Sequence, residues 1–172
     1  MKRIIRNISY LLLVLSLLPI ISGCNNEDDI VEIFTGKTWK LSRLTDKDSS
    51  DRFYQGLWNG DKTAQNKSLS LLNNEKNTFT LSFEGSEING ELMGTTVSGR
   101  GVNSSFSGTW SADGKSNSMN INIKSSGSES DVLAKAFIAG LQKVYKYEGD
   151  ANSLTLFFDD NGITRVIGFK PQ

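Results

Sequence analysis

Hydrophobic and polar residues alternate with a period of two along most of the chain after residue 77, which is the pattern of β-strands with one buried face. The hydrophobic positions of the clearest strands are Trp39 and Leu41, Phe79, Leu81 and Phe83, and Met119, Ile121 and Ile123. Similar stretches are SSFSGTW, VYKYEGD, SLTLFFDD and GITRVIGFK. We expect these strands to turn their hydrophobic positions toward one shared core.

Short turn sequences separate several of these strands. Asn161-Gly162 is the strongest hairpin signal, because both residues accept the positive φ angles of a two-residue turn. Asp113-Gly114 predicts a second tight turn for the same reason. The stretch 86–100 reads as two further strands joined near Met93-Gly94.

One helix interrupts the strands, at about residues 129–145. Ser128 with Asp131 resembles a capping box at its start. Gly140 costs a helix about 1 kcal/mol relative to alanine, so we interpret it as a point of close packing on a sheet. The hydrophobic stripe of this helix consists of Val132, Leu133, Ala136, Phe137, Leu141 and Val144.

The segment 45–77 is mostly polar and contains one aromatic cluster. Phe53, Tyr54, Leu57 and Trp58 have the spacing of one face of a short helix, which Asp48 or Ser49 can cap. Two interpretations are open. The cluster is either a buried plug over one end of the sheet or an exposed aromatic surface for a glycan, lipid or protein. Phe53, Tyr54 and Trp58 are therefore the candidate binding surface.

Together these elements predict a mostly β fold. Many short strands and a single helix favour a strongly bent antiparallel sheet or an open barrel, with the helix at about 129–145 packed over one end or over an open seam.

The first 23 residues have the three parts of a secretory signal peptide. A basic start is followed by an apolar run over residues 8–21 and then by small residues. The run is shorter than the roughly 20 residues of a membrane span. Ile21-Ser22-Gly23 before the only cysteine, Cys24, resembles a bacterial lipobox. That resemblance implies cleavage before Cys24 and attachment of diacylglycerol and an N-acyl chain, such as palmitate, to Cys24.

The residues after Cys24 are acidic and read as a tether over 24–34, before a domain over 35–172. Cys24 followed by Asn-Asn-Glu-Asp-Asp resembles the surface-export signal of lipoproteins in the Bacteroides lineage. The expected location is the outer membrane, with the cell surface and the periplasmic face both open. The expected membrane contact is through the N-terminal lipid.

The composition excludes several classes of function. Histidine is absent and no cysteine follows Cys24, which excludes a Ser-His-Asp triad, a Cys-His pair and a His-ligated zinc site. Removing residues 1–23 removes three of the 19 basic residues and no acidic residue, which leaves a net charge of −3. Such a chain lacks the basic face that nucleic-acid binding needs. We therefore expect a monomeric, non-enzymatic protein with no cofactor and no metal site.

The order of features resembles the META domain of bacterial lipoproteins related to the heat-shock protein HslJ. The resemblance rests on Gly101-Val102-Asn103, on Phe106-Ser107-Gly108-Thr109-Trp110, and on the helix and strands that follow. It covers about residues 36–170. Valine at 102 replaces the cysteine of the family motif, and the segment 45–77 is longer than the family requires. A lipocalin-like barrel is the alternative.

The resulting hypothesis is a lipid-anchored cell-envelope protein that acts in envelope binding or stress protection. One alternative is a lipocalin-like binder of a small ligand inside the barrel. Another is an inhibitor of a host or envelope hydrolase that acts through protruding loops. A dry cavity lined by Phe79, Phe83 and the other strand-facing apolar residues would favour the first alternative, and a filled core with an exposed aromatic loop would favour the second.

Overall fold

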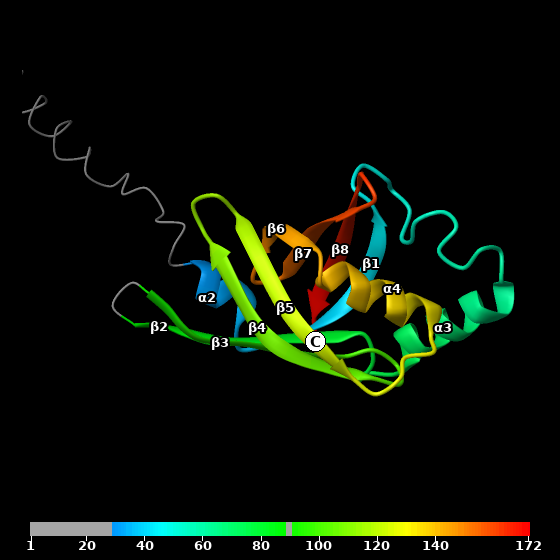
Figure 1. The fold of residues 1–172 in the computed structure, drawn as a ribbon, viewed down its shortest axis with the longest axis horizontal. Coiled ribbons are helices and arrows are strands. Elements are labelled where there is room, and N and C mark those ends of the chain that lie inside the picture. The colour runs from blue at the N-terminus through cyan, green and yellow to red at the C-terminus, as the bar shows by residue number, and fades with distance from the viewer. Residues whose placement is uncertain (1–28, 89–90) are drawn as a thin grey trace, which may run out of the picture.

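The computed structural model describes residues 29–88 and 91–172, in which eight antiparallel strands form one closed barrel (Figure 1). Neighbouring strands in the chain pair with one another, and β8 pairs back with β1. The mostly β fold is confirmed, and the barrel is closed rather than open. The strands are β1 (Thr38–Asp46), β2 (Thr80–Ile88), β3 (Glu91–Arg100), β4 (Ser105–Asp113), β5 (Ser118–Ser126), β6 (Val144–Asp150), β7 (Ser153–Asp160) and β8 (Ile163–Pro171).

The predicted helix is α4 (Val132–Leu141), which is shorter than the expected range of 129–145. Its N-cap is Asp131, whose side chain accepts a hydrogen bond from the backbone N–H of Ala134, so Ser128 is not the cap. Val144 belongs to β6 and not to the helix. Leu133, Phe137 and Leu141 are buried, as the stripe predicted.

The helix α4 closes the barrel where its sheet pairing is weakest. β5 and β6 share only the pair Ser118–Lys146, and α4 lies in the connection between these two strands. The ring of Phe137 lies 6.0 Å from that of Phe106 on β4 and 6.0 Å from that of Phe169 on β8. A Cβ at Gly140 would lie 3.1 Å from the side chain of Ile167, which confirms the close approach.

A second helix, α2 (Asp29–Phe34), is a correction to the predicted tether of 24–34. Phe34 is fully buried, and its ring lies 5.0 Å from that of Phe83 and 4.9 Å from that of Tyr147. The indole N–H of Trp39 also donates to the Phe34 carbonyl at 3.2 Å. The domain therefore begins at residue 29 or earlier, and α2 fills one end of the barrel. Ile30 and Phe34, four residues apart, form its buried face.

A third helix, α3 (Lys62–Asn74), lies in the segment where only a short helix around residues 53–58 was predicted. The prediction was wrong because Gly56, Asn59 and Gly60 have positive φ angles, which break a right-handed helix. Asp61 then caps α3 by accepting from the Ala64 N–H at 3.0 Å, so neither Asp48 nor Ser49 is its cap.

The predicted hairpin at Asn161-Gly162 is confirmed, with φ angles of 57° and 85° between the paired residues Asp160 and Ile163. The other two turns need correction. β4 and β5 are joined by residues 114–117, which is longer than the tight turn predicted at Asp113-Gly114. β2 and β3 pair at Ile88 and Glu91, so the reversal does not occur near Met93-Gly94.

Large side chains fill the interior of the barrel. The predicted inward positions of β2 and β5 are all buried. The largest side chains with less than 2 % exposure are Trp39, Phe34, Phe79, Phe83, Phe137 and Phe169. Two hollows, of about 590 and 580 Å³, open on the outer surface. Ligand binding is therefore to be sought on the outside.

Candidate binding surfaces

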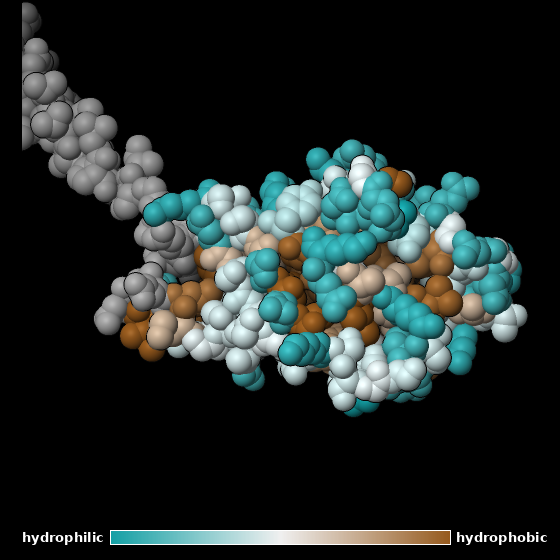
Figure 2. Space-filling view, in the orientation of Figure 1, coloured by the Kyte–Doolittle hydropathy of each residue, from teal (hydrophilic) through white to brown (hydrophobic). Residues whose placement is uncertain are grey.

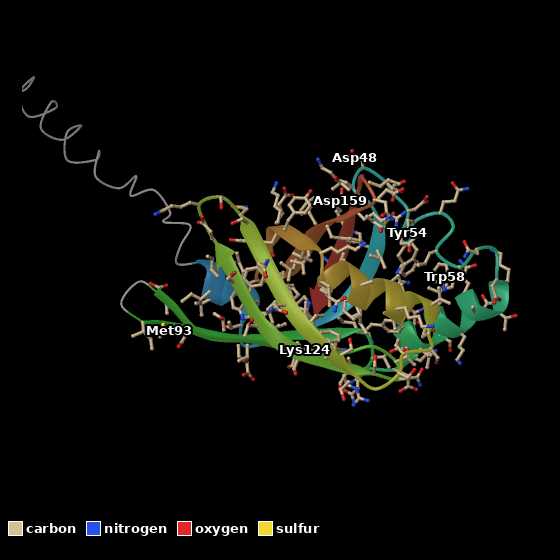
Figure 3. The ribbon with its side chains drawn as sticks, in the orientation of Figure 1. Asp48, Tyr54, Trp58, Met93, Lys124 and Asp159 are labelled. Carbon is tan, nitrogen blue, oxygen red and sulfur yellow. The ribbon has the colours of Figure 1, made fainter. Side chains whose placement is uncertain are left out.

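The aromatic cluster predicted as a binding surface is divided between core and surface. Trp58 is only 8 % exposed, and its indole N–H donates to the Ser68 hydroxyl at 3.2 Å. Phe53 is partly buried and packs edge-on against Trp58, with ring centroids 5.3 Å apart. Tyr54 is also partly buried (Figure 3). The cluster is thus neither a fully buried plug nor a widely exposed platform.

Arginine side chains cover the partly exposed rings. The Arg165 guanidinium lies 3.7 Å from the Tyr54 ring centroid, and the Arg52 guanidinium lies 5.1 Å from that of Phe53. Arg165 is itself held by ion pairs with Asp46 and Asp160. Burial raises the pKa of the Tyr54 hydroxyl, which Arg165 opposes and Asp160 and Asp46 reinforce. Because one face of each ring is occupied, the cluster fixes the β1–α3 loop to the barrel and offers little stacking surface.

Backbone contacts support this structural role. Leu44 on β1 accepts a hydrogen bond from the Tyr54 N–H and donates to the Arg52 carbonyl, both at 2.9 Å. The loop therefore adds a short bridge to the edge of β1. The hollow of about 580 Å³ on this loop lies among residues 51–65.

A different surface, which the sequence analysis missed, lies on the outer face of β1 to β5. Successive strand registers pair Thr38 with Ser82, Ser82 with Ser98, Ser98 with Ser107, and Ser107 with Lys124. One row of hydroxyl groups therefore crosses four strands and ends at a lysine. Adjacent strands lie about 4.7–4.9 Å apart, so the hydroxyls form a closely spaced ladder.

A second row runs beside the first. Thr80 pairs with Arg100, Arg100 with Ser105, and Ser105 with Ser126. The two rows line the hollow of about 590 Å³, and in Figure 2 pale, weakly polar residues lie along β4, next to teal residues along β5. We call this the hydroxyl groove, defined by Thr38, Thr80, Ser82, Ser98, Arg100, Ser105, Ser107, Lys124 and Ser126.

Inward-facing glycines shape the sheet beneath the groove. A Cβ at Gly99 would lie 2.2 Å from the Thr80 carbonyl oxygen and 2.3 Å from the Phe106 ring. A Cβ at Gly108 would lie 1.9 Å from the Asn122 carbonyl oxygen. The strands therefore approach each other and the core more closely than any side chain allows at these points.

The groove carries positive charge. The side chains of Arg100 and Lys124 are exposed, and within the described ranges neither makes a hydrogen bond or an ion pair. No acidic side chain of the described part of the chain lines the groove. Lys40 lies in the same register row as Thr80 but serves the fold, because its ammonium donates to the carbonyls of Glu75 and Thr78 at the end of α3. Burial lowers the pKa of Lys40, and the Glu75 carboxylate raises it to a smaller extent.

The groove carries groups of the kind that form hydrogen bonds and ion pairs with ligands. Serine and threonine hydroxyls both donate and accept hydrogen bonds, and the two cations suit carboxylate, sulfate or phosphate groups. The chain contains no histidine to activate a hydroxyl. No cluster of three potential metal ligands occurs in the residues that the structure describes.

The proposed lipid site lies outside the described residues. Cys24 and the cleavage positions Ile21, Ser22 and Gly23 all precede residue 29, where the described chain begins in α2. From residue 29 onward, none of the described helices has the length and hydrophobicity needed to span a bilayer.

A family model for a domain of unknown function, DUF4847, matches residues 25–171. The chain is also similar to a protein of that family from Bacteroides vulgatus, known from a crystal structure at 1.00 Å resolution. The two share 27 % identity and a TM-score of 0.60, over 82 % of this chain and 96 % of that one. No curated protein sequence matches.

These matches correct the resemblance to the META domain, which was wrong. The motif residues behind that resemblance have local structural roles here. Gly101 leaves room for Glu129, whose carboxylate oxygen would lie 2.2 Å from a Cβ at that position. Gly108 permits the close strand approach described above. Strongly bent sheets in general need glycine where a strand approaches another strand or a side chain this closely, so these glycines do not identify one family.

Proposed function

This chain belongs to the DUF4847 family, and we propose that it is a lipid-anchored envelope protein that binds an acidic polysaccharide in the hydroxyl groove, without catalysis. The observation that carries the proposal is a pair of cations, Arg100 and Lys124, that have no side-chain partner among the described residues and lie among two rows of hydroxyl groups.

The lipid anchor is supported by the residues before Cys24. An aliphatic residue and two small ones follow a short apolar run and precede Cys24, which is the order of residues in the bacterial lipobox that this segment resembles. Each buried methylene contributes about 0.8 kcal/mol, and stable attachment needs more than one acyl chain. Three chains on Cys24 meet that need without a spanning helix.

The packed interior favours binding on the outside over a lipocalin-like function. Phe34, Phe83 and Trp110 meet inside one end of the barrel with ring centroids 5.0–5.2 Å apart, in the space where a lipocalin holds its ligand. Phe137 packs into the same core from α4.

The chemistry of the groove favours a polysaccharide over a protein partner. Protein interfaces concentrate their energy in central aromatic and apolar side chains, and the outward positions of the groove carry none. A polysaccharide presents hydroxyls at regular intervals, which the Ser and Thr rows can match. Carboxylate or sulfate groups on the sugar would pair with Arg100 and Lys124. The hydrolase-inhibitor alternative needs an exposed aromatic loop, whereas Trp58 is buried.

The binding test compares polygalacturonate with its methyl ester, which has the same backbone and no charge. We expect binding of the charged form, weakening as salt is added. The double variant Arg100→Ala and Lys124→Ala should bind at least about tenfold more weakly, because each charged hydrogen bond contributes about 1.5–3 kcal/mol. The matched control is Lys67→Ala and Lys135→Ala, which removes two exposed charges from α3 and α4. Equal binding of the ester, or of the groove variant, would overturn the polysaccharide proposal.

The anchor has its own test. Cells labelled with radioactive palmitate should label the wild-type protein and leave the Cys24→Ala variant unlabelled. Equal labelling of the two proteins would show that Cys24 is not the lipid site.

A further inference from the structure

The end of the β2–β3 hairpin carries apolar side chains that the barrel does not cover. Ile88 is 54 % exposed and Met93 is 50 % exposed, more than any other large hydrophobic residue that the structure describes. The strand register pairs Ser86 with Met93 and Ile88 with Glu91, which places Ile88 and Met93 on one face of the hairpin. Figure 2 shows this end of the molecule as a brown projection, and Figure 3 places Met93 there.

The helix α2 lies beside this hairpin, with its first turn toward the hairpin end. Phe34, at the end of α2, packs on Phe83 of β2. Ile30, at its start, shares a hollow of about 200 Å³ with Glu87 and Leu92 near the hairpin end. The chain therefore enters the domain at the same end of the barrel as the exposed pair (Figure 1).

The chain length limits how far this end can be from the lipid on Cys24. Asp29 is five residue steps after Cys24, and a fully extended chain spans at most about 3.6 Å per step, or about 18 Å. The five residue steps from Phe83 to Ile88 extend about 17 Å along β2, whereas the five steps of α2 rise only about 7.5 Å. The hairpin end therefore reaches beyond α2, on the side from which the tether comes.

We propose that Ile88 and Met93 enter the headgroup region of the bilayer that holds the lipid of Cys24, and that this contact fixes the orientation of the barrel. The inference rests on the lipid anchor of the proposed function. Exposed apolar side chains next to an anchor have a partner at high local concentration, since the tether converts docking into an intramolecular step. Glu87 and Asp113 near the same end favour a zwitterionic over an anionic lipid surface.

This orientation also places the hydroxyl groove. Ser82 lies six residues from Ile88 along β2, or about 20 Å. With the hairpin end in the headgroups, the groove stands clear of the bilayer, where a polysaccharide can reach it.

The test uses the full chain, processed and lipidated in cells, and reconstituted in phosphatidylcholine vesicles. Because the thiol of Cys24 is consumed by its lipid, a cysteine introduced by Met93→Cys is the only free thiol and can carry an environment-sensitive dye. Lys67→Cys on α3, at the far end of the molecule in Figure 1, is the matched control. Nitroxide-bearing lipid should remove about half or more of the emission of the Met93→Cys probe, since interfacial side chains lie roughly 5–10 Å into the boundary. The control probe should lose little.

A third probe, Ser86→Cys on the same hairpin face, tests the apolar pair without replacing it. Its quenching should disappear when Ile88→Asn and Met93→Asn are added. Vesicle binding is measured by flotation of the protein with the vesicles in a density gradient. Protein that floats with the vesicles but shows equal quenching for Met93→Cys and Lys67→Cys would overturn the inference and leave the anchor intact. Disulfide-linked dimers of unlabelled Met93→Cys without lipid quenching would assign the pair to a second copy of the chain and also overturn it. Protein that does not float would overturn both proposals.

Discussion

Ser68 on α3 donates a hydrogen bond from its hydroxyl to the Asp131 carboxylate at the start of α4, at 2.7 Å and fully within the protein. The same serine accepts from the Trp58 indole at 3.2 Å, and Asp131 also accepts from the Ala134 N–H at 2.9 Å. One serine therefore joins the aromatic loop, α3 and the N-cap of α4. This link explains why the polar segment 45–77 is an integral part of the domain.

Replacing Ser68 with alanine should lower the free energy of unfolding by about 1–3 kcal/mol. The change leaves a buried carboxylate oxygen and a buried indole N–H without their partner, and the desolvation cost of such groups is of that size. Urea unfolding followed by tryptophan fluorescence measures it. The control is Ser70→Ala on the same helix, whose side chain is exposed and should change stability by less than about 0.5 kcal/mol. Equal losses for both variants would mean that helix propensity, and not the buried link, accounts for the effect.

Glu129 should make stability depend on pH. Its Oε2 accepts hydrogen bonds from the N–H groups of Val102 and Asn103 and from the Ser104 hydroxyl, at 2.8–3.0 Å. Burial raises the pKa of Glu129, but these bonds and one from the Asp131 N–H outweigh burial and lower the pKa below its ordinary value of 4.5. Because the folded-state pKa is the lower one, the stabilisation is present above about pH 4.5 and is lost as pH falls through the folded pKa.

We therefore expect Glu129→Gln to be less stable than wild type at neutral pH and to approach it as pH falls below about 4.5. Urea midpoints measured across this range give the difference. Glu32→Gln, at an exposed position on α2, is the control and should leave the wild-type profile unchanged. A stability difference between Glu129→Gln and wild type that persists at low pH would contradict the role given to the ionised carboxylate.

Phe137 should be one of the costliest positions to truncate. It is fully buried on α4 and contacts the rings of Phe106 and Phe169. Phe137→Ala should cost about 3–5 kcal/mol, since it removes a large side chain from a packed core. Lys135→Ala on the same helix changes an exposed side chain and serves as the control in the same urea experiment. A loss below about 1 kcal/mol would show that α4 is peripheral to the stability of the barrel.

The sequence predicted strand faces well because the period of a strand is two. Once Leu81 and Phe83 are placed inward, every intervening residue is outward, whatever the neighbouring strands do. The α4 stripe was predicted for a similar reason, since Phe137 and Leu141 are one turn apart. By contrast, α3 buries only Ser68 and Leu72, so it has almost no hydrophobic stripe to detect.

The candidate binding surfaces were harder to predict from the sequence than the buried and exposed faces of the strands. The hydroxyl groove depends on strand register, which brings Ser82, Ser98 and Ser107 into one row although successive members are 16 and 9 residues apart in the chain. An isolated outward serine carries no such information. The sequence prediction put the end of the β2–β3 hairpin near Met93-Gly94, whereas the strands pair as far as Ile88 and Glu91. The dipeptide between these two residues in the sequence, Asn89-Gly90, is the turn signal that would have predicted this position. That error also concealed the exposure of Ile88 and Met93.

The acidic residues after Cys24 should direct display on the cell surface. Glu27 and Asp28 lie before the described residues and Asp29 begins α2, so at least part of this acidic stretch adjoins a folded element. Replacing all three with alanine should make the protein inaccessible to external protease on intact cells, while wild type is cleaved.

Removing acids near the start of a helix also weakens the helix slightly, by about 0.3–1 kcal/mol per charge. The control is therefore the charge-preserving variant Glu27→Asp, Asp28→Glu and Asp29→Glu, which should remain accessible. The unfolding temperature of the alanine variant must stay close to that of wild type. Only then does protection from external protease indicate altered export and not misfolding. If the alanine variant and wild type are equally accessible to protease, the acidic residues act only as a solvated spacer. If protease does not cleave the wild-type protein on intact cells, the domain lies on the periplasmic face.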